Sequence, residues 1–430
     1  MPRAFIKETI DMINQQTNDR RALITAIIGS GLDDLNVMFL AFSLPSIISS
    51  LGISQTQAGW IATITNFGML FGGIVFGILA DRYNKYRVFK WTILIFSLAT
   101  GLIFLTSNIY YLYLMRFIAG IGVGGEYGVA VAIMAGIVPP QKMGRMAALN
   151  GIAGQVGSIC SALLAGLAAP LLGWKGLFLL GLLPLLLVAY MHQQVDADRI
   201  SNRHVEEDQT SRPSIKELFA TPALAHQSIA LMVMTTVQIA GYFGMMNWLP
   251  TIMQESLGLS IKNSSTWMIA TIIGMCIGML VFGQILDHLG PRLAYSLFLL
   301  MSAASVYLFQ FANSAWTLMV GGMIVGFFVN GMFSGYGAMV SRLYSGRVHS
   351  IANNVILNVG RAIGGFSSVI IGKILDSSSV AMVMFFLASL YLVSFIVMLS
   401  IPHLQKDRYD ELLESDGVQE TYSEVEPSVV

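Results

Sequence analysis

The chain of 430 residues is strongly apolar: 55% of its residues are hydrophobic, 11% are charged, and its mean hydropathy is +0.68. Soluble domains carry about 25% charged residues, so the composition excludes an ordinary soluble domain and predicts an all-α integral membrane protein in a lipid bilayer. The 24 basic residues balance the 24 acidic ones, so no global field favours nucleic acid as a partner. Cys160 and Cys276 are too few for a disulfide framework or a Cys-rich metal site. We expect no cofactor and no metal.

Twelve apolar segments are long enough to cross a bilayer, which takes about 20 residues each. They are 22–49, 57–80, 88–106, 109–137, 145–171, 175–193, 223–250, 264–286, 292–312, 314–341, 347–374 and 379–401. A long mixed-charge stretch separates the sixth segment from the seventh. We therefore predict an N-terminal segment 1–21, a six-helix bundle 22–193, a linker 194–222, a second six-helix bundle 223–401 and a tail 402–430.

The distribution of Lys and Arg predicts the orientation of the chain, because cytoplasmic loops carry an excess of both. An N-terminus in the cytoplasm leaves only Lys175, Lys262 and Lys373 on the outer side. We expect a multi-pass protein of the cell membrane, an inner membrane in bacteria, with both termini and the linker in the cytoplasm. We expect it to act as a monomer.

An internal repeat relates the two halves at an offset of 206 residues. GILADRYNKYR, from Gly77, matches GQILDHLGPR, from Gly283, and both lie where the second segment of a half ends. A small residue allows close helix packing. The turn residues, Asn84 and Gly290, are expected to adopt a left-handed conformation, which glycine and asparagine tolerate.

The repeated loop, the twelve segments and the central linker together resemble the major facilitator superfamily, whose signature loop between spans two and three has this form. The resemblance implies two pseudo-symmetric six-helix bundles and a gate between them. The alternative, charges that merely follow the orientation rule, leaves the repeated Gly-Asp spacing unexplained. The residues that the resemblance assigns to the gate are Gly77, Asp81, Arg82, Arg87, Gly283, Asp287 and Arg292.

Five ionisable residues lie deep within the predicted spans: Asp33, Asp34, Arg116, Glu126 and Arg361. Such residues usually face one another or a water-filled cavity. The repeat is an internal control, because it preserves Gly120 and Gly125 of the fourth span as Gly326 and Gly331 and replaces the charges. The mates of Asp33, Asp34, Arg116 and Glu126 are Ile239, Ala240, Gly322 and Met332. We therefore expect the charges to serve function rather than packing.

In the fourth span, Arg116, Gly120 and Gly124 share one face, which predicts a smooth strip for a neighbouring helix. Glu126 lies about 280° round the helix and roughly 15 Å further along, so it cannot pair with Arg116 directly. Glu126 therefore finds a partner on another helix, or it is neutral for part of a transport cycle because burial favours the uncharged carboxyl. A carboxyl that titrates in this way can carry a proton.

The string from Arg116 to Tyr127, R-F-x-x-G-x-G-x-G-G-E-Y, resembles the branch of aromatic-acid, sialic-acid, phosphate and related metabolite:proton symporters. That branch often has D-G-[FY]-D in its first span. Here Asp33 matches the first Asp, Asp34 stands in the place of Gly, and Asn36 replaces the second Asp. We expect Asp33 and Asn36 to face the cavity and Asp34 to pack against a neighbouring helix or, alternatively, to lie hydrated in a wide vestibule. Glu126, Asp33 and Asp34 are the candidates for proton coupling.

Arg361, in NVGRAIGGF, resembles the organic-anion members of this branch, and Arg binds carboxylates through two parallel hydrogen bonds. It binds either a substrate carboxylate or one of the acidic residues of the first half; Arg116 is a second substrate candidate. Uncharged candidates within spans are Gln155, Gln238, Tyr242 and Asn358, and each could instead join two helices.

The resemblance implies proton-coupled uptake of a small organic anion, such as an aromatic acid, a sugar acid or sialic acid. Alternatives are a proton-coupled or facilitative transporter of sugars or other neutral metabolites, a drug or metabolite antiporter, and a membrane sensor without transport. The glycine-rich runs lie within apolar helices and lack a following Lys-Ser/Thr, which argues against ATP binding. Gln155 stands where the superfamily's antiporters carry Pro. No nucleophile, metal cluster or acid/base pair lies at a soluble face, so we do not expect an enzyme.

Overall fold

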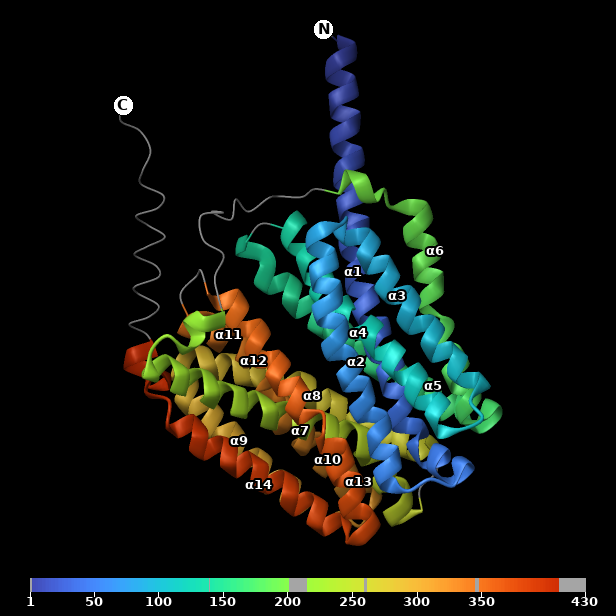
Figure 1. Ribbon diagram of the computed structural model, residues 1–430, viewed down its shortest axis with the longest axis vertical. Coiled ribbons are helices and arrows are strands. Elements are labelled where there is room, and N and C mark those ends of the chain that lie inside the picture. The colour runs from blue at the N-terminus through green and yellow to red at the C-terminus, as the bar shows by residue number, and fades with distance from the viewer. Residues whose placement is uncertain (1, 139, 201–214, 259–260, 345–347, 410–430) are drawn as a thin grey trace. The chain divides into compact units, whose positions relative to one another are not determined.

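The computed structural model describes residues 2–138, 140–200, 215–258, 261–344 and 348–409, and within them every long element is helical (Figure 1). The α-helices are α1 Pro2–Leu51, α2 Gln55–Arg82, α3 Lys85–Leu102, α4 Ile109–Ile137, α5 Pro140–Leu179, α6 Pro184–Gln194, α7 Pro222–Leu257, α8 Ile261–Leu289, α9 Pro291–Phe309, α10 Ala315–Gly331, α11 Phe333–Leu343, α12 His349–Gly364, α13 Ser367–Ser377 and α14 Val380–Leu399. The 3-10 turns are η1 Ile103–Leu105, η2 Leu180–Leu182, η3 Ala197–Arg199, η4 Ile215–Phe219 and η5 Pro402–Leu404.

Eleven apolar helical segments of the described chain are long enough to cross a membrane. The fifth, Leu149–Gln194, has 46 residues, more than twice the about 20 that one crossing needs. It bends at Gly173, whose φ of 68° is in the region that glycine adopts most easily. This segment therefore contains two of the predicted spans, and the all-α fold with twelve membrane-spanning segments is confirmed.

The helices begin at the polar residues that the sequence places between apolar runs. Ser54 and Gln57 form a capping box at the start of α2, and the Asn108 side chain accepts a hydrogen bond from the Tyr111 amide at the start of α4. These caps satisfy amide groups that have no partner inside the helix. Short loops and defined starts thus fix which residues of neighbouring helices face one another.

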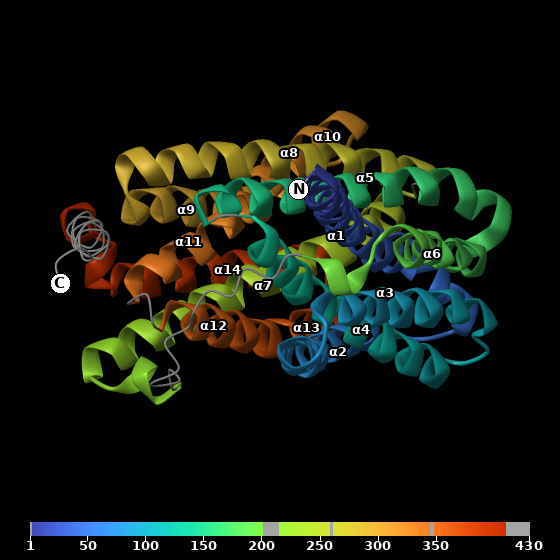
Figure 2. The same ribbon diagram turned by 90° about the horizontal axis from the view of Figure 1, so that it is seen from above.

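The described chain forms two compact units. Unit 1 takes in Met1–Gln209, Gly244–Ile269 and Ser368–Ser377, and unit 2 takes in Thr210–Phe243, Ala270–Ser367 and Ser378–Val430. In unit 1, α1 packs on α5 and α2 packs on α4, and in unit 2, α9 packs on α14 (Figure 2). The two predicted bundles, 22–193 and 223–401, are each continuous in the sequence, whereas the two compact units are not. The bundle boundaries stay a prediction.

A glycine-lined contact joins α2 to α4 in unit 1. A Cβ atom on Gly68 would overlap the Phe117 carbonyl oxygen, and one on Gly120 would overlap the Thr65 carbonyl oxygen. A Cβ on Gly124 would overlap the backbone of Met69. The absence of side chains lets the two backbones approach closely. The predicted smooth strip on α4 is therefore confirmed.

The same contact recurs in unit 2 between α8 and α10. Gly274 lies against the Met323 carbonyl oxygen and Gly326 against that of Thr271. Gly274, Thr271 and Gly326 are the repeat mates of Gly68, Thr65 and Gly120 at the offset of 206 residues. The repeat read from the sequence is thus a repeat of backbone packing.

The tenth and eleventh predicted spans are interrupted, whereas their repeat mates, the fourth and fifth spans, are continuous helix in α4 and in the first part of α5. α10 ends at Gly331 and α11 begins at Phe333, and α12 ends at Gly364 before α13 begins at Ser367. Gly331 and Gly364 are the last residues of α10 and α12. They weaken the helix locally because glycine loses more backbone freedom on ordering than other residues. Arg361 therefore lies in the last turn of α12, next to an interruption.

Candidate functional site

Arg116 is buried between α4 and α2, with 2% of its surface exposed. Its Nε donates a hydrogen bond to Thr65 Oγ1 at 3.1 Å. The buried carboxylate of Asp33, on α1, lies close enough to act electrostatically on the guanidinium. Arg116 thus has a neutral partner on one neighbouring helix and an anionic neighbour on another, as a buried cation requires.

Glu126 is fully buried where α4 meets α1. Ser30 Oγ lies 3.3 Å from Glu126 Oε1 and 3.5 Å from Oε2, as a donor to the carboxylate. A Cβ on Gly29 would lie 3.1 Å from Glu126 Oε1 and would also meet Phe89 and Ile93. The carboxyl group therefore has a hydroxyl donor and apolar neighbours, in a space that exists because position 29 has no side chain.

Asp34 is half-buried and faces α5. A Cβ on Gly154 would overlap Asp34 Oδ2, and Gly157 lies against the Gly31 carbonyl oxygen in the same helix contact. Asp34 also lies close enough to Glu126 for two negative charges to repel each other.

Asn36 is buried and faces η2. Its Nδ2 donates to the Leu32 carbonyl oxygen at 2.9 Å, and a Cβ on Gly181 would lie 2.6 Å from its Oδ1. Gln155, on α5, is also buried. Gln155 is the repeat mate of Arg361, so corresponding helices carry an amide in one half and a guanidinium in the other.

In unit 2, Arg361 and Asn358 are half-buried on the last turns of α12. Gln238 is buried, and its Nε2 donates to the Val329 carbonyl oxygen at 2.7 Å, which joins α7 to α10. The Tyr242 ring stacks on Phe333 with ring centroids 6.4 Å apart. Gln238 thus joins two helices, which is the alternative role that the sequence allows for it. The substrate-binding role of Arg361, Asn358, Gln238 and Tyr242 stays a prediction.

The first copy of the signature loop is tied to the segment that follows α6. Arg87 forms an ion pair with Asp198 at 2.6 Å, and Asn84 Nδ2 donates to the Ala197 carbonyl oxygen at 2.7 Å. Arg82 is exposed, Gly77 has open space beside it, and the Asp81 side chain lies outside the described residues. The predicted left-handed turn at Asn84 is wrong: its φ is −59°, and its side chain instead caps α3 by accepting hydrogen bonds from two backbone amides.

The second copy retains the glycine turn that the sequence predicts. Gly290 has a φ of 81°, so a side chain at this position would be strained. Arg292 Nη2 donates to the Leu399 carbonyl oxygen at 3.3 Å, at the end of α14. Asp287 is exposed, and Gly283 has open space beside it. Whether either copy acts as a gate stays a prediction.

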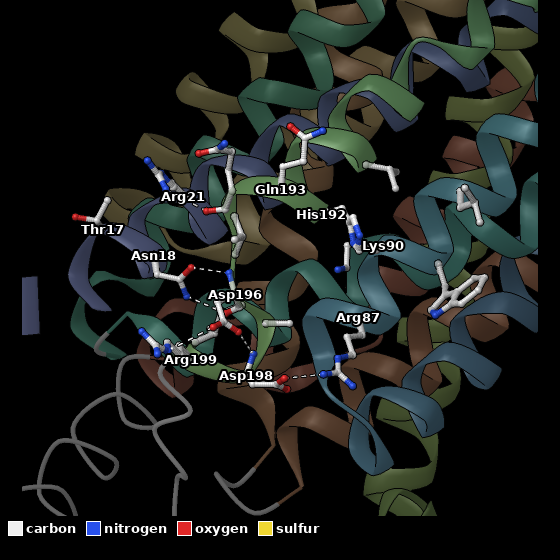
Figure 3. Close-up of a pocket in the computed structure, with 17 residues that line it drawn as sticks. Thr17, Asn18, Arg21, Arg87, Lys90, His192, Gln193, Asp196, Asp198 and Arg199 are labelled. Carbon is white, nitrogen blue, oxygen red and sulfur yellow. Dashed lines mark hydrogen bonds and ion pairs between the residues drawn. The ribbon is translucent and has the colours of Figure 1, made fainter. Parts of the chain in front are cut away.

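A cavity of about 1420 Å³ opens at the end of unit 1, between α1, α3 and α6 (Figure 3). Basic and acidic side chains line it together with the backbone of the segment after α6. None of the buried charged residues Asp33, Arg116 and Glu126 lines this cavity. The cavity is therefore separate from these residues, which together with Asp34 form the charged cluster of unit 1.

The hydroxyl partners of Glu126 and Arg116, which are Ser30 and Thr65, are not evident from the sequence. Small hydroxyl residues are common in membrane helices, and only the packing of α1 and α2 against α4 shows which of them meet a charge. The role of Asp376 on α13 is not evident from the sequence either: its carboxylate accepts hydrogen bonds from the Gln55 and Thr56 amides at 2.9 and 2.8 Å. That contact stabilises the positive end of the α2 dipole.

The charged cluster of unit 1 gathers titratable side chains inside the membrane-spanning part of the unit. Three carboxyl groups and one guanidinium lie on α1 and α4, away from the ends of both helices. Among the described residues, no group of three or more His, Cys, Asp and Glu side chains is arranged to hold a metal ion. The groups can therefore bind protons, water or a small ion, and the two carboxyl groups Asp34 and Glu126 are electrostatically linked.

Comparison with known proteins agrees with this architecture. The family model of the Major Facilitator Superfamily matches residues 26–293 and 231–416. A protein of Haemophilus influenzae assigned to metabolite transport is 33% identical over 397 residues, which cover 91% of this chain and 98% of that protein. The cis,cis-muconate transport protein of Acinetobacter baylyi is 27% identical over 368 residues, 84% of this chain and 89% of that protein. A solved D-xylose-proton symporter aligns with a TM-score of 0.74 and 14% identity over 91% of this chain and 99% of its own, which shows the fold alone.

Proposed function

Because the chain belongs to the Major Facilitator Superfamily, we propose that it is a secondary active transporter that couples the uptake of a small organic anion to protons. The two predicted bundles, 22–193 and 223–401, alternate in opening a central site to either side of the membrane. Muconate, the substrate named for one relative, is a dicarboxylate, and the metabolite branch that the fourth span resembles includes carriers of organic acids. The proposed substrates are accordingly carboxylates: aromatic acids, sugar acids or sialic acid.

The observation that carries this proposal is the asymmetry of charge between the two halves. Asp33, Asp34, Arg116 and Glu126 are all replaced by uncharged residues at the corresponding positions of unit 2. The glycine contact beside Arg116, between α2 and α4, is nevertheless repeated between α8 and α10. Charges that packing does not require, in an environment where each costs at least ~2.5–3.5 kcal/mol, are best explained by transport.

In the proposed cycle, Glu126 takes up the coupled proton. Its neighbours support this role: Ser30 supplies a hydroxyl donor to the buried carboxyl group, and Asp34 on α1 is a second carboxyl group near it. Asp33 is the second candidate, but its negative charge is balanced by Arg116. Protonation of Glu126 would remove a charge from the membrane interior before the cavity closes.

Arg361 is proposed to bind the substrate carboxylate, with Arg116, Asn36, Gln155, Gln238, Tyr242 and Asn358 as further candidates. A guanidinium presents two parallel donors that match the two oxygens of a carboxylate. The position of Arg361 beside an interrupted helix supports the assignment, because transporters of this kind bind substrates where membrane helices are discontinuous.

The remaining features of the proposal concern topology and energetics. Both termini lie in the cytoplasm, the protein acts as a monomer in the cell membrane, and the two signature loops regulate opening on the cytoplasmic side. The membrane potential contributes up to ~2.3 kcal/mol per net charge per 100 mV. The membrane potential therefore drives accumulation of an anion only when the protons carried in each cycle outnumber the substrate charges.

Uptake of labelled cis,cis-muconate into proteoliposomes under an imposed pH gradient tests the proposal. We expect the unaltered protein to accumulate the label above its equilibrium level, with more accumulation when the outside is acidic. Glu126→Gln should still exchange labelled for unlabelled muconate in the absence of a gradient, but it should not respond to the gradient. Arg361→Lys, which keeps the charge but loses the two-donor fork, should weaken muconate binding by roughly tenfold.

Each result has a contradicting counterpart. Gradient-driven accumulation by Glu126→Gln would show that Glu126 does not carry the proton. Uptake that does not respond to pH and to Arg361→Lys would contradict anion symport, and outward movement of the label against proton entry would indicate an antiporter. If muconate itself is not carried, a thermal-shift screen of aromatic and sugar acids identifies the carboxylate to use in the same assay.

A further inference from the structure

The cavity between α1, α3 and α6 contains basic side chains that the proposed transport cycle does not use. Arg21 comes from α1, Arg87 and Lys90 come from α3, and His192 comes from the end of α6. In Figure 3, Arg21 lies on one side of the cavity and Arg87 and Lys90 lie on the other. The cavity thus combines side chains from three membrane helices at one end of unit 1.

Two of the basic residues around this cavity already have anionic partners. Arg87 pairs with Asp198 at 2.6 Å, and Arg199 pairs with Asp196 at 3.4 Å. Arg21 is held by a neutral contact, a hydrogen bond of 3.1 Å from Nη1 to the Gln194 carbonyl oxygen. Its guanidinium has further donors.

The Lys90 ammonium group lies over the Tyr86 ring, 5.9 Å from the ring centroid. A ring stabilises a cation without neutralising its charge. Arg21 and Lys90 therefore bring net positive charge to the cavity.

α3 and α6 also contribute apolar side chains to the wall of the cavity. Trp91, Leu94 and Val188 line it, and 59% of the Trp91 surface is exposed. Exposed Trp side chains are typical of the boundary between lipid and water. Arg21, Lys90 and His192 each lie within a few residues of an end of their membrane segment. Positive charge and apolar surface therefore meet at the level of the lipid headgroups.

The repeat shows that the fold does not require this basic lining. The mates of Arg21, Arg87, Lys90 and Trp91 in the second half are Gln227, Leu293, Ser296 and Leu297. Gln227 lies at the corresponding end of unit 2, where it contacts His403 and the Leu343 carbonyl oxygen. One half thus carries basic and aromatic residues at positions where the other half carries none.

We propose that the cavity between α1, α3 and α6 binds the headgroup of an anionic phospholipid from the surrounding bilayer. Arg21 and Lys90 hold the phosphate, and Trp91, Leu94 and Val188 contact the upper part of an acyl chain. In the proposed orientation the site faces the cytoplasmic leaflet. Because Arg87 also ties the signature loop to the segment after α6, a lipid bound here would contact both.

Native mass spectrometry of the purified full-length chain, titrated with phosphatidylglycerol or with phosphatidylcholine, tests this site. We expect one phosphatidylglycerol molecule to bind at least tenfold more tightly than phosphatidylcholine. Arg21→Gln and Lys90→Ser introduce the residues of the repeat mates, and each should weaken phosphatidylglycerol binding about fivefold, the effect of one basic residue near a lipid surface. Together they should weaken it about 25-fold.

Neighbouring basic residues outside the cavity lining provide matched controls. Arg20→Gln and Lys85→Ser make the same changes on the same helices and should alter binding by less than about twofold, and Arg21→Lys should retain most of it. Equal losses in the controls, or no preference between the two lipids, would overturn the proposal. Displacement of phosphatidylglycerol by millimolar inorganic phosphate would identify a site for a soluble anion and would overturn the lipid assignment. The thermal stability of each variant shows whether it is folded.

Discussion

The contact between α2 and α4 in unit 1 and the contact between α8 and α10 in unit 2 share a backbone design. In both, glycines of one helix lie against carbonyl oxygens of the other, and a threonine carbonyl lies against the same glycine position. The difference lies in the side chains. Thr65 Oγ1 accepts a hydrogen bond from Arg116, whereas Thr271 Oγ1 lies 2.6 Å from where a Cβ of Gly322 would be.

This difference separates the requirements of packing from those of chemistry. Close approach of the two helices depends on glycine in both halves, so it belongs to the fold. The charge at Arg116 occurs in one half only, where it is accompanied by the buried carboxylate of Asp33. Because α8 and α10 pack in the same way without a charge at the position of Arg116, the fold does not require this charge.

The largest effect is expected from filling the glycine contact in either half. Gly120→Leu and Gly326→Leu each place a side chain where the backbone of the partner helix lies. Overpacking costs typically 1–3 kcal/mol and more when backbone must move, so both variants should lose most of their monodisperse folded protein. Size-exclusion chromatography of the detergent-solubilised protein measures this. A tolerated leucine in one half alone would show that the two contacts are not equivalent.

Breaking the charge pair of unit 1 should have the next largest effect. Arg116→Met leaves Asp33 buried without its positive neighbour, which should destabilise the protein by about 3 kcal/mol. For a bundle of this size that corresponds to a decrease in Tm of about 10 °C.

The double variant Asp33→Ile/Arg116→Met is the control for this effect. It removes both charges, with the residue of the repeat mate at position 33, and should recover most of the lost stability. Differential scanning fluorimetry at pH 7 compares the variants. A double variant as unstable as the single one would mean that the charges support the fold.

The smallest effect is expected at the threonine pair. Thr65→Val removes the hydroxyl that accepts from Arg116 and should cost about 1 to 2 kcal/mol, because the donor is charged. Thr271→Val removes a hydroxyl that lies against Gly322, the repeat mate of Arg116, and should cost less. The difference between the two variants in Tm measures what the Arg116 contact contributes. Equal costs would assign the effect to the helix contact itself.

The sequence alone predicts the features that depend on repeated spacing. The offset between Gly77 and Gly283 predicts two related halves, and the glycines after Arg116 predict the surface on which α2 packs. The absence of charge at the mates of Asp33 and Glu126 is also visible without coordinates. Such features follow from periodicity, because a helix fixes which of its own residues share a face.

The features that the sequence does not predict depend on which helices meet. Ser30 and Thr65 resemble many other hydroxyl residues until α1 and α2 are placed against α4. Asn84 was expected to form the turn with its backbone, and instead it caps α3 with its side chain. Arg21 and Lys90 look like ordinary residues at a membrane surface until α1, α3 and α6 bring them to one cavity. Contacts between distant segments need the tertiary structure.

The most direct test of the account replaces Glu126 by methionine, the residue of its repeat mate Met332, and measures stability and transport on one preparation. The account predicts that Glu126→Met has a Tm equal to or above that of the unaltered protein, because an apolar side chain replaces a buried carboxyl group. It also predicts exchange of muconate without any accumulation driven by a pH gradient. A decrease in Tm of about 10 °C or more, or accumulation at the unaltered level, would contradict the claim that this charge serves proton coupling rather than the fold.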